Sequence, residues 1–140
     1  MSGDTFKKVG KSSKTLYGPR AMLACGFTAP EQQALMGFLE SINLADIPVI
    51  FTTETDGNAC LKDLLERPGQ SGRDQACGAD RAIILSGITE NELQRTLSAY
   101  RGTELPRPLW ATLTPYSEAW CLSDLLEELK KEREAMEKKK

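Results

Sequence analysis

Two short segments of the sequence carry the residue types from which an anion-binding site could be built. In each, a glycine is followed two positions later by a threonine and then by a glutamate at Thr-x-x-Glu spacing; the segments begin at Gly26 and Gly87, 61 positions apart. This spacing is typical of a capping box, in which the hydroxyl and the carboxylate bind free amides at a helix start. Helix N-termini that point into one cleft can bind phosphate or carboxylate. Gly26, Thr28, Gly87 and Thr89 are therefore candidate ligand-binding residues, although the glutamates occupy the same amides and favour a structural role.

Other patterns that could support catalysis are sparse. The chain has no histidine, and its four cysteines show no Cys-x-x-Cys spacing, so we expect no catalytic residue, no metal site and no cofactor. Cys25, Cys60 and Cys121 lie in apolar runs, where a free thiol packs as a small hydrophobic group. The segment 10–12, Gly-Lys-Ser, resembles the end of a P-loop, but Thr5 stands where that motif requires glycine.

Carboxylates follow both of the predicted outer strands. Glu54 and Asp56 follow the first and Glu118 the second. The outer strands of a four-stranded sheet are about 14 Å apart, whereas a hydrolytic carboxylate pair needs roughly 5–9.5 Å. They therefore cannot act as a pair across the sheet, and Glu54 with Asp56 could at most hold a hard cation.

The sequence repeats itself at the same offset. Residues 60–66, Cys-Leu-Lys-Asp-Leu-Leu-Glu, return as residues 121–127, Cys-Leu-Ser-Asp-Leu-Leu-Glu. The period is too long and the copies are too few for a solenoid, so the pattern predicts two equivalent halves of one domain. The predicted parts are a basic N-terminal arm or edge hairpin (1–20), an α/β domain (21–130) with halves at 21–66 and 81–130 and a connector at 67–80, and a charged helix end (131–140).

Each half predicts the order strand, helix, strand, helix. The runs at 21–25 and 82–85 are continuously apolar, which is typical of central strands buried on both faces. The runs at 49–52 and 109–113 follow prolines, which are tolerated at the first residue of a strand or on a sheet edge. The four predicted helices begin after Thr28, near Cys60, after Thr89 and near Trp120.

These elements predict an α/β fold of two pseudo-repeated β-α-β-α halves. The links between the first two strands of each half are long enough for a parallel crossover. Pairing the halves gives a four-stranded, mainly parallel, Rossmann-like sheet of order 2-1-3-4 with helices on both faces. Ligands of such sheets bind at the carboxyl ends of the central strands, so we expect a crevice between the Gly26 and Gly87 loops, with Tyr116 as a further contact.

Aromatic residues gather near the last strand and helix. Trp110, Tyr116 and Trp120 are candidates for core packing. If Trp110 faces outward on an edge strand, it indicates a contact surface, because edge strands and aromatic side chains favour association. The sequence thus allows a protein partner or a homodimer through an edge strand.

The charge is unevenly distributed along the chain. The net charge is +4 over residues 1–20, +3 over 130–140 and −9 between them. An acidic body makes nucleic acid an unlikely partner. No segment of about 20 apolar residues predicts a membrane span, and no apolar run of about 7–15 residues follows the early lysines as in a signal peptide. We therefore expect a cytoplasmic protein.

Several segments together resemble a small prokaryotic family, the domain of unknown function thirty-seven eighty-three. The most distinctive is 106–111, Pro-Arg-Pro-Leu-Trp-Ala, and the resemblance extends over residues 17–130. The family has no established activity, ligand or catalytic residues, so the resemblance implies no role for any position. The leading hypothesis is a non-catalytic α/β binding or interaction module. The alternative is a small-ligand sensor or small enzyme that uses the crevice.

Overall fold

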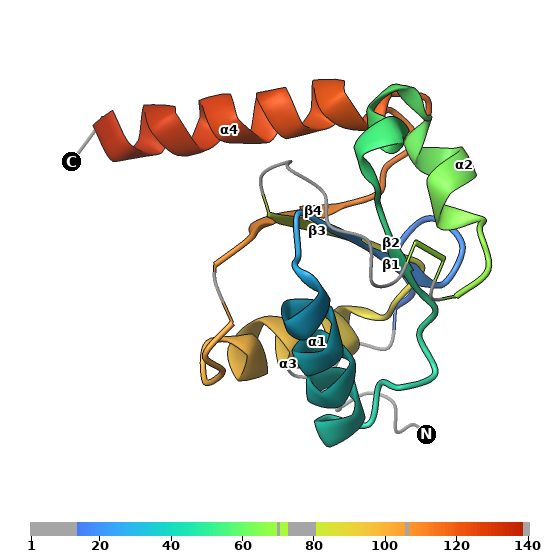
Figure 1. Cartoon of the computed structure of the whole chain (residues 1–140), viewed down its shortest axis with the longest axis vertical. Helices are drawn as coiled ribbons and strands as arrows, with labels where there is room; N and C mark the ends of the chain where they lie inside the picture. The colour runs from blue at the N-terminus through green and yellow to red at the C-terminus, as the bar shows by residue number, and fades with distance from the viewer. Residues whose placement is uncertain (1–13, 70, 73–80, 106, 139–140) are drawn as a thin grey trace, which may run out of the picture.

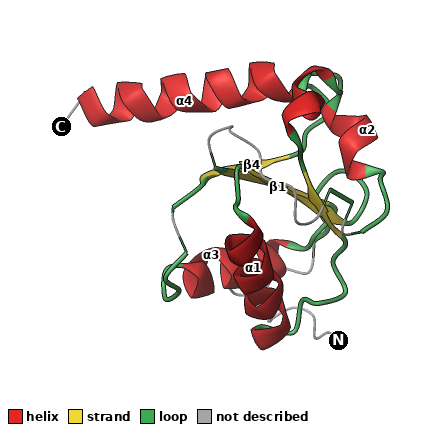
Figure 2. Ribbon diagram, viewed as in Figure 1, coloured by secondary structure: helices red, strands yellow, loops and turns green. Residues whose placement is uncertain are grey.

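A four-stranded sheet lies between two layers of helices (Figures 1 and 2). The structure, a computed structural model, describes residues 14–69, 71–72, 81–105 and 107–138. Its elements in chain order are β1 (Ala21–Cys25), α1 (Ala29–Ser41), β2 (Val49–Phe51), the 3₁₀ helix η2 (Glu54–Asn58), α2 (Leu61–Leu65), β3 (Ala82–Ser86), α3 (Glu90–Tyr100), β4 (Leu109–Thr112) and α4 (Leu122–Lys138). All four predicted strands and four predicted helices are present, and η2 is the element that the sequence did not predict.

The strand order β2-β1-β3-β4 confirms the predicted order. β1 pairs with β2 in parallel, and β3 pairs with β4 in parallel. The central pair, however, is antiparallel, with Ala21 opposite Ser86 and Cys25 opposite Ala82. The expectation that both central strands run in the same direction is therefore wrong. A central strand buries the same apolar residues in either direction, so its burial pattern does not determine the direction.

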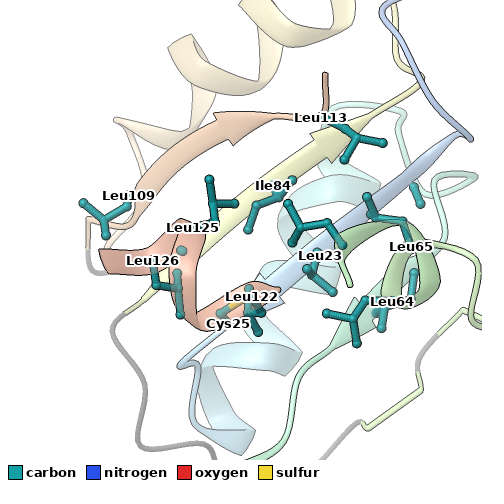
Figure 3. Packing of buried hydrophobic residues seen from close by; sticks show 14 residues of the cluster. Leu23, Cys25, Leu64, Leu65, Ile84, Leu109, Leu113, Leu122, Leu125 and Leu126 are labelled. Atoms are coloured by element: carbon teal, nitrogen blue, oxygen red, sulfur yellow. The ribbon is translucent and has the colours of Figure 1, made fainter. Parts of the chain in front are cut away.

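Helices cover both faces of the sheet, as predicted. α1 and α3 lie on one face, and α2 and α4 lie on the other (Figure 2). Successive side chains of a strand point to opposite faces, so Met22 and Ala24 of β1 pack in the first layer and Leu23 and Cys25 pack in the second. Figure 3 shows the second layer, in which leucines of α2 and α4 cover the strands.

The last helix is longer than the sheet that it covers. Its first turns bury Leu122, Leu125 and Leu126 against the strands, and its C-terminal part extends past the sheet (Figure 1). Among the described residues, no helix is both long and apolar enough to cross a bilayer.

Candidate functional site

The predicted crevice between the Gly26 and Gly87 loops does not exist in this fold. Each loop follows the carboxyl end of its own central strand, and the two central strands are antiparallel. Gly26 and Thr28 therefore lie at one end of the sheet, and Gly87 and Thr89 lie at the opposite end. Tyr116 follows β4, which runs parallel to β3, so it lies at the Gly87 end. The five residues cannot contact one ligand.

The two threonines cap helices, as the Thr-x-x-Glu spacing predicts. The amide of Thr28 donates to the carboxylate of Glu31 at 2.9 Å, and the Glu31 amide donates back to the Thr28 hydroxyl at 3.4 Å. The same reciprocal bonds join Thr89 and Glu92, at 2.9 and 3.1 Å. These hydroxyls and amides therefore already have intramolecular partners.

The Gly87 loop is covered by the chain itself. The amide of Gly87 donates to the carbonyl of Tyr17, and the amide of Leu16 donates to the carbonyl of Ile88. A Cβ atom at Gly87 would lie 2.5 Å from the Gly18 carbonyl oxygen. This loop is a packed turn against the segment 14–20, and the part of that segment that the structure describes begins at Lys14.

Two Arg–Glu ion pairs connect the halves of the chain in a reciprocal way. Arg20 precedes β1 and binds Glu92 of α3 through two hydrogen bonds of 2.7 and 2.9 Å. Arg81 precedes β3 and binds Glu31 of α1 at 2.8 and 3.2 Å. Each carboxylate thus caps a helix and pairs with an arginine of the other half.

The ion pairs perturb the titration of both glutamates. The Arg20 guanidinium lowers the pKa of Glu92 to about 2, against the opposing effect of burial. Burial alone would raise the pKa of Glu31, but hydrogen bonds from Arg81 and from the Thr28 amide outweigh it and hold this pKa below its ordinary value. Both carboxylates are therefore charged at neutral pH and serve as structural anions.

The outer edges of the sheet differ in how they are covered. On β2, all three residues are buried, and of the two amides that point away from β1, that of Phe51 donates to the carbonyl of Ser71 at 2.8 Å, whereas that of Val49 has no backbone acceptor among the described residues. On β4, the amides of Leu109 and Leu113 bond to β3, so the amides of Trp110 and Thr112 between them point away from the sheet. Within the described residues these two amides have no backbone acceptor. Trp110, Ala111 and Thr112 are each only partly buried. Among the residues that the structure describes, none pairs with the outer edge of β4, and we refer to this edge as open.

An arginine-lined cavity of about 680 Å³ lies beside this open edge. Arg101 and Arg107 from the α3–β4 loop and Arg133 from α4 line it together with Trp110 and Tyr100. No acidic residue of the described chain lines it. The cavity therefore suits a negatively charged group next to an apolar one.

An aromatic row supports the wall of this cavity. The ring of Tyr100 meets the ring of Trp110 edge to face at a centroid distance of 5.1 Å, and it meets Phe38 in the same way at 5.6 Å. Burial raises the pKa of Tyr100 to about 12, so its hydroxyl remains neutral at physiological pH. Edge-to-face contacts favour a fixed ring orientation, so the indole is held in place between the core and the edge of β4.

A smaller cavity of about 430 Å³ lies on the other side of the α3–β4 loop. Apolar residues of α1, including Ala34 and Phe38, form part of its wall, and Glu31 and Glu104 also line it. Thr103 and Leu105 line both cavities. None of the five predicted site residues lines either one.

The β4 edge and the arginines of the cavity lie in the part of the chain that matches a known protein family. Residues 81–136 match the family model for a domain of unknown function (DUF3783). This match confirms the resemblance, which rests above all on the segment around Trp110. It covers β3 through most of α4, whereas the resemblance extends from residue 17. No curated protein and no solved structure matches the chain.

Sequence reasoning considered Trp110 as a contact residue but missed the arginines beside it. The signal that could have found them was weak. Arg107 lies between the two prolines that lead into an outer strand, and Arg101 follows the predicted α3 helix. Arg133 lies in a charged run that we expected to be a solvated helix end, and only the path of α4 brings it to the cavity.

The carboxylate of Asp56, a candidate cation ligand, has a structural role. It accepts a hydrogen bond from the Thr53 amide at 2.7 Å and forms an ion pair with Arg67 at 3.1 Å. Among the described residues, no three or more acidic or cysteine side chains gather as a metal ion would require.

Proposed function

We propose that the protein is a non-catalytic interaction module that binds an extended, acidic segment of a partner protein along the edge of β4. The observation that carries the proposal is the contrast between the two outer strands. The outward amide of Phe51 on β2 is satisfied by Ser71, whereas Trp110 and Thr112 on β4 direct their amides outward. An extended chain that adds to such an edge supplies backbone acceptors, and its alternate side chains fit neighbouring pockets.

The cavity beside β4 supports an acidic partner. Arg101, Arg107 and Arg133 place three positive charges around it. A guanidinium binds a carboxylate through two parallel hydrogen bonds, which provides orientation as well as affinity. A glutamate or aspartate side chain of an added strand can enter the cavity while the strand backbone pairs with β4.

We also propose that the two halves are copies of one unit. Contacts in one half recur in the other half 61 positions later. Met22 pairs with Val49 in the first half, and the equivalent residues Ile83 and Trp110 pair in the second. The Arg20–Glu92 and Arg81–Glu31 ion pairs are related by the same offset. On this proposal, β2 and β4 are equivalent strands. Gly69 and Ser71, which follow α2, lie against β2, while no described segment covers β4.

Calorimetry with designed peptides tests the proposed function. The probe is an eight-residue peptide of alternating valine and glutamate, and the comparison peptide has lysine in place of glutamate. We expect saturable binding of the glutamate peptide and none of the lysine peptide. Arg107→Glu should weaken binding at least about tenfold, because it reverses one cavity charge. Arg95→Glu is the matched control, since Arg95 is an exposed residue of α3 that does not line the cavity.

Three results would overturn the proposal. The first is the absence of saturable binding, and the second is equal binding of the two peptides. The third is an equal loss of binding in the Arg95→Glu control.

Native mass spectrometry of the protein without peptide tests the alternative occupants of the edge and the cavity. A concentration-dependent dimer that Thr112→Pro abolishes would assign the edge to a second copy of this chain instead. A copurifying small anion that Arg107→Glu removes would assign the cavity to a small-ligand sensor.

A further inference from the structure

Two cysteines that are far apart in the sequence lie directly opposite each other. Cys60 and Cys121 form an isolated antiparallel bridge between the segment before α2 and the segment before α4. The flanking amides of Leu61 and Leu122 donate to the carbonyls of Trp120 and Ala59, each at 3.0 Å. Figure 1 shows the start of α4 beside η2 and α2.

This hydrogen-bond pattern defines the geometry of the cysteine pair. The bonds are made by the residues on either side of Cys60 and Cys121 and not by the cysteines themselves. In such a pair, the two Cα atoms are about 4.5 Å apart, and the side chains project to the same side. A disulfide requires Cα atoms roughly 4.4–6.8 Å apart. The backbone therefore already holds the two residues within disulfide range.

The two thiols are also accessible to a reagent. Both are free, and both are partly exposed to solvent. Cys25 differs, because its side chain is fully buried in the layer between the sheet and the helices α2 and α4. Among the described cysteines, Cys60 and Cys121 are thus the two that are both partly exposed to solvent and opposite another cysteine.

We propose that Cys60 and Cys121 are a thiol–disulfide modification site that reacts with small-molecule disulfides such as oxidised glutathione. The thiolate of one cysteine attacks the glutathione disulfide, forms a mixed disulfide and releases one glutathione thiolate. The second cysteine thiolate then attacks the protein sulfur of the mixed disulfide and releases the second glutathione. Two protein thiols are oxidised to one disulfide, and one glutathione disulfide is reduced to two thiols.

The bond would join the starts of α2 and α4 on one face of the sheet. It closes a loop that contains α2, β3, α3 and β4, so it restricts the unfolded chain more than it changes the folded one. The site lies on the helix layer of α2 and α4 and is independent of the peptide edge proposed for β4.

The experiment uses the full-length chain with Cys77→Ser, treated while folded with oxidised glutathione. We expect intact mass measurement to show the loss of two hydrogen atoms, and peptide mapping to show a Cys60–Cys121 link. Cys60→Ser and Cys121→Ser should each retain one glutathione adduct, because the mixed disulfide then has no resolving thiol. Oxidation should raise the urea midpoint of unfolding, and dithiothreitol should reverse both changes.

The proposal would be overturned by two separate glutathione adducts on the parent chain. It would equally be overturned by disulfide-linked dimers as the main product. The third contrary result is a folded parent chain that stays fully reduced under conditions in which the urea-unfolded chain is oxidised.

Discussion

At the scale of single residues, Glu31 and Glu92 each perform two structural tasks. Each completes a capping box at the start of a helix, and each pairs with an arginine from the other half of the chain. These tasks explain why the threonine loops are poor anion sites, since a carboxylate already occupies the amides that a ligand would need. The loops that we considered for ligand binding instead connect the halves of the domain.

The lowered pKa of Glu92 predicts a specific acid sensitivity. Its folded-state pKa is about 2 against an ordinary value of 4.5, so its stabilising contribution is complete above pH 4.5 and is lost as the pH falls from about 4.5 to about 2. The side chain of Arg20 is 33% exposed, so we expect a contribution of about 1–2 kcal/mol, less than the full shift implies.

Urea unfolding of the parent chain and Arg20→Gln at pH 7 and at pH 3 measures this contribution together with that of the exposed Asp46, which Arg20 also binds at 2.9 Å. The variant should be less stable by about 1–2 kcal/mol at pH 7, and the difference should shrink at pH 3. Lys62→Gln, on the short helix α2, controls for the loss of one positive charge. An Arg20→Gln deficit that is the same at both pH values would show that the ion pair with Glu92 is not its source.

At the scale of elements, the turn from β3 into α3 is tightly packed against the segment before β1. Gly87 has φ = 65°, a left-handed conformation that glycine adopts without steric cost. A Cβ there would also lie within 2.6 Å of the Arg20 amide nitrogen, which is backbone and cannot move aside easily. The segment before β1 therefore depends on a glycine at this turn.

Gly87→Ala should lower the free energy of unfolding by at least about 2 kcal/mol, because strain and a backbone clash add together. Gly37→Ala is the matched control. Gly37 lies within α1, and a Cβ there meets nothing within 4 Å, so that variant should be stabilised by up to about 1 kcal/mol. Thermal and urea unfolding of both variants measure the difference. Equal stability of Gly87→Ala and the parent would contradict the packed turn.

At the scale of the whole molecule, the elements and their order could be predicted because their signals are local. The apolar runs at 21–25 and 82–85 and the capping boxes after them are complete within a few residues. The structure has strands and helices at these positions, within a residue or two of the predicted bounds. The strand order was predictable because the proline-led runs favour the sheet edges, where β2 and β4 lie.

The direction of the central strands could not be predicted from the same signals. A buried strand has the same apolar pattern in either direction, and a connector of 14 residues, 67–80, is long enough for both arrangements. The predicted crevice required parallel central strands, and it does not form because β1 and β3 are antiparallel. The arginine cavity could not be predicted either, because it forms only where the folded chain places the α3–β4 loop beside the C-terminal part of α4.

Amide hydrogen exchange of the β4 edge, with and without the valine–glutamate peptide, tests the central claim most directly. In the free protein, the amides of Trp110 and Thr112 should exchange rapidly, while the Phe51 amide on the covered edge should be protected. On addition of the peptide, at least one of the two β4 amides should become protected, and Phe51 should not change. Slow exchange of both β4 amides in the free protein, or peptide binding that protects neither of them, would contradict the claim that β4 is an open edge for a partner strand.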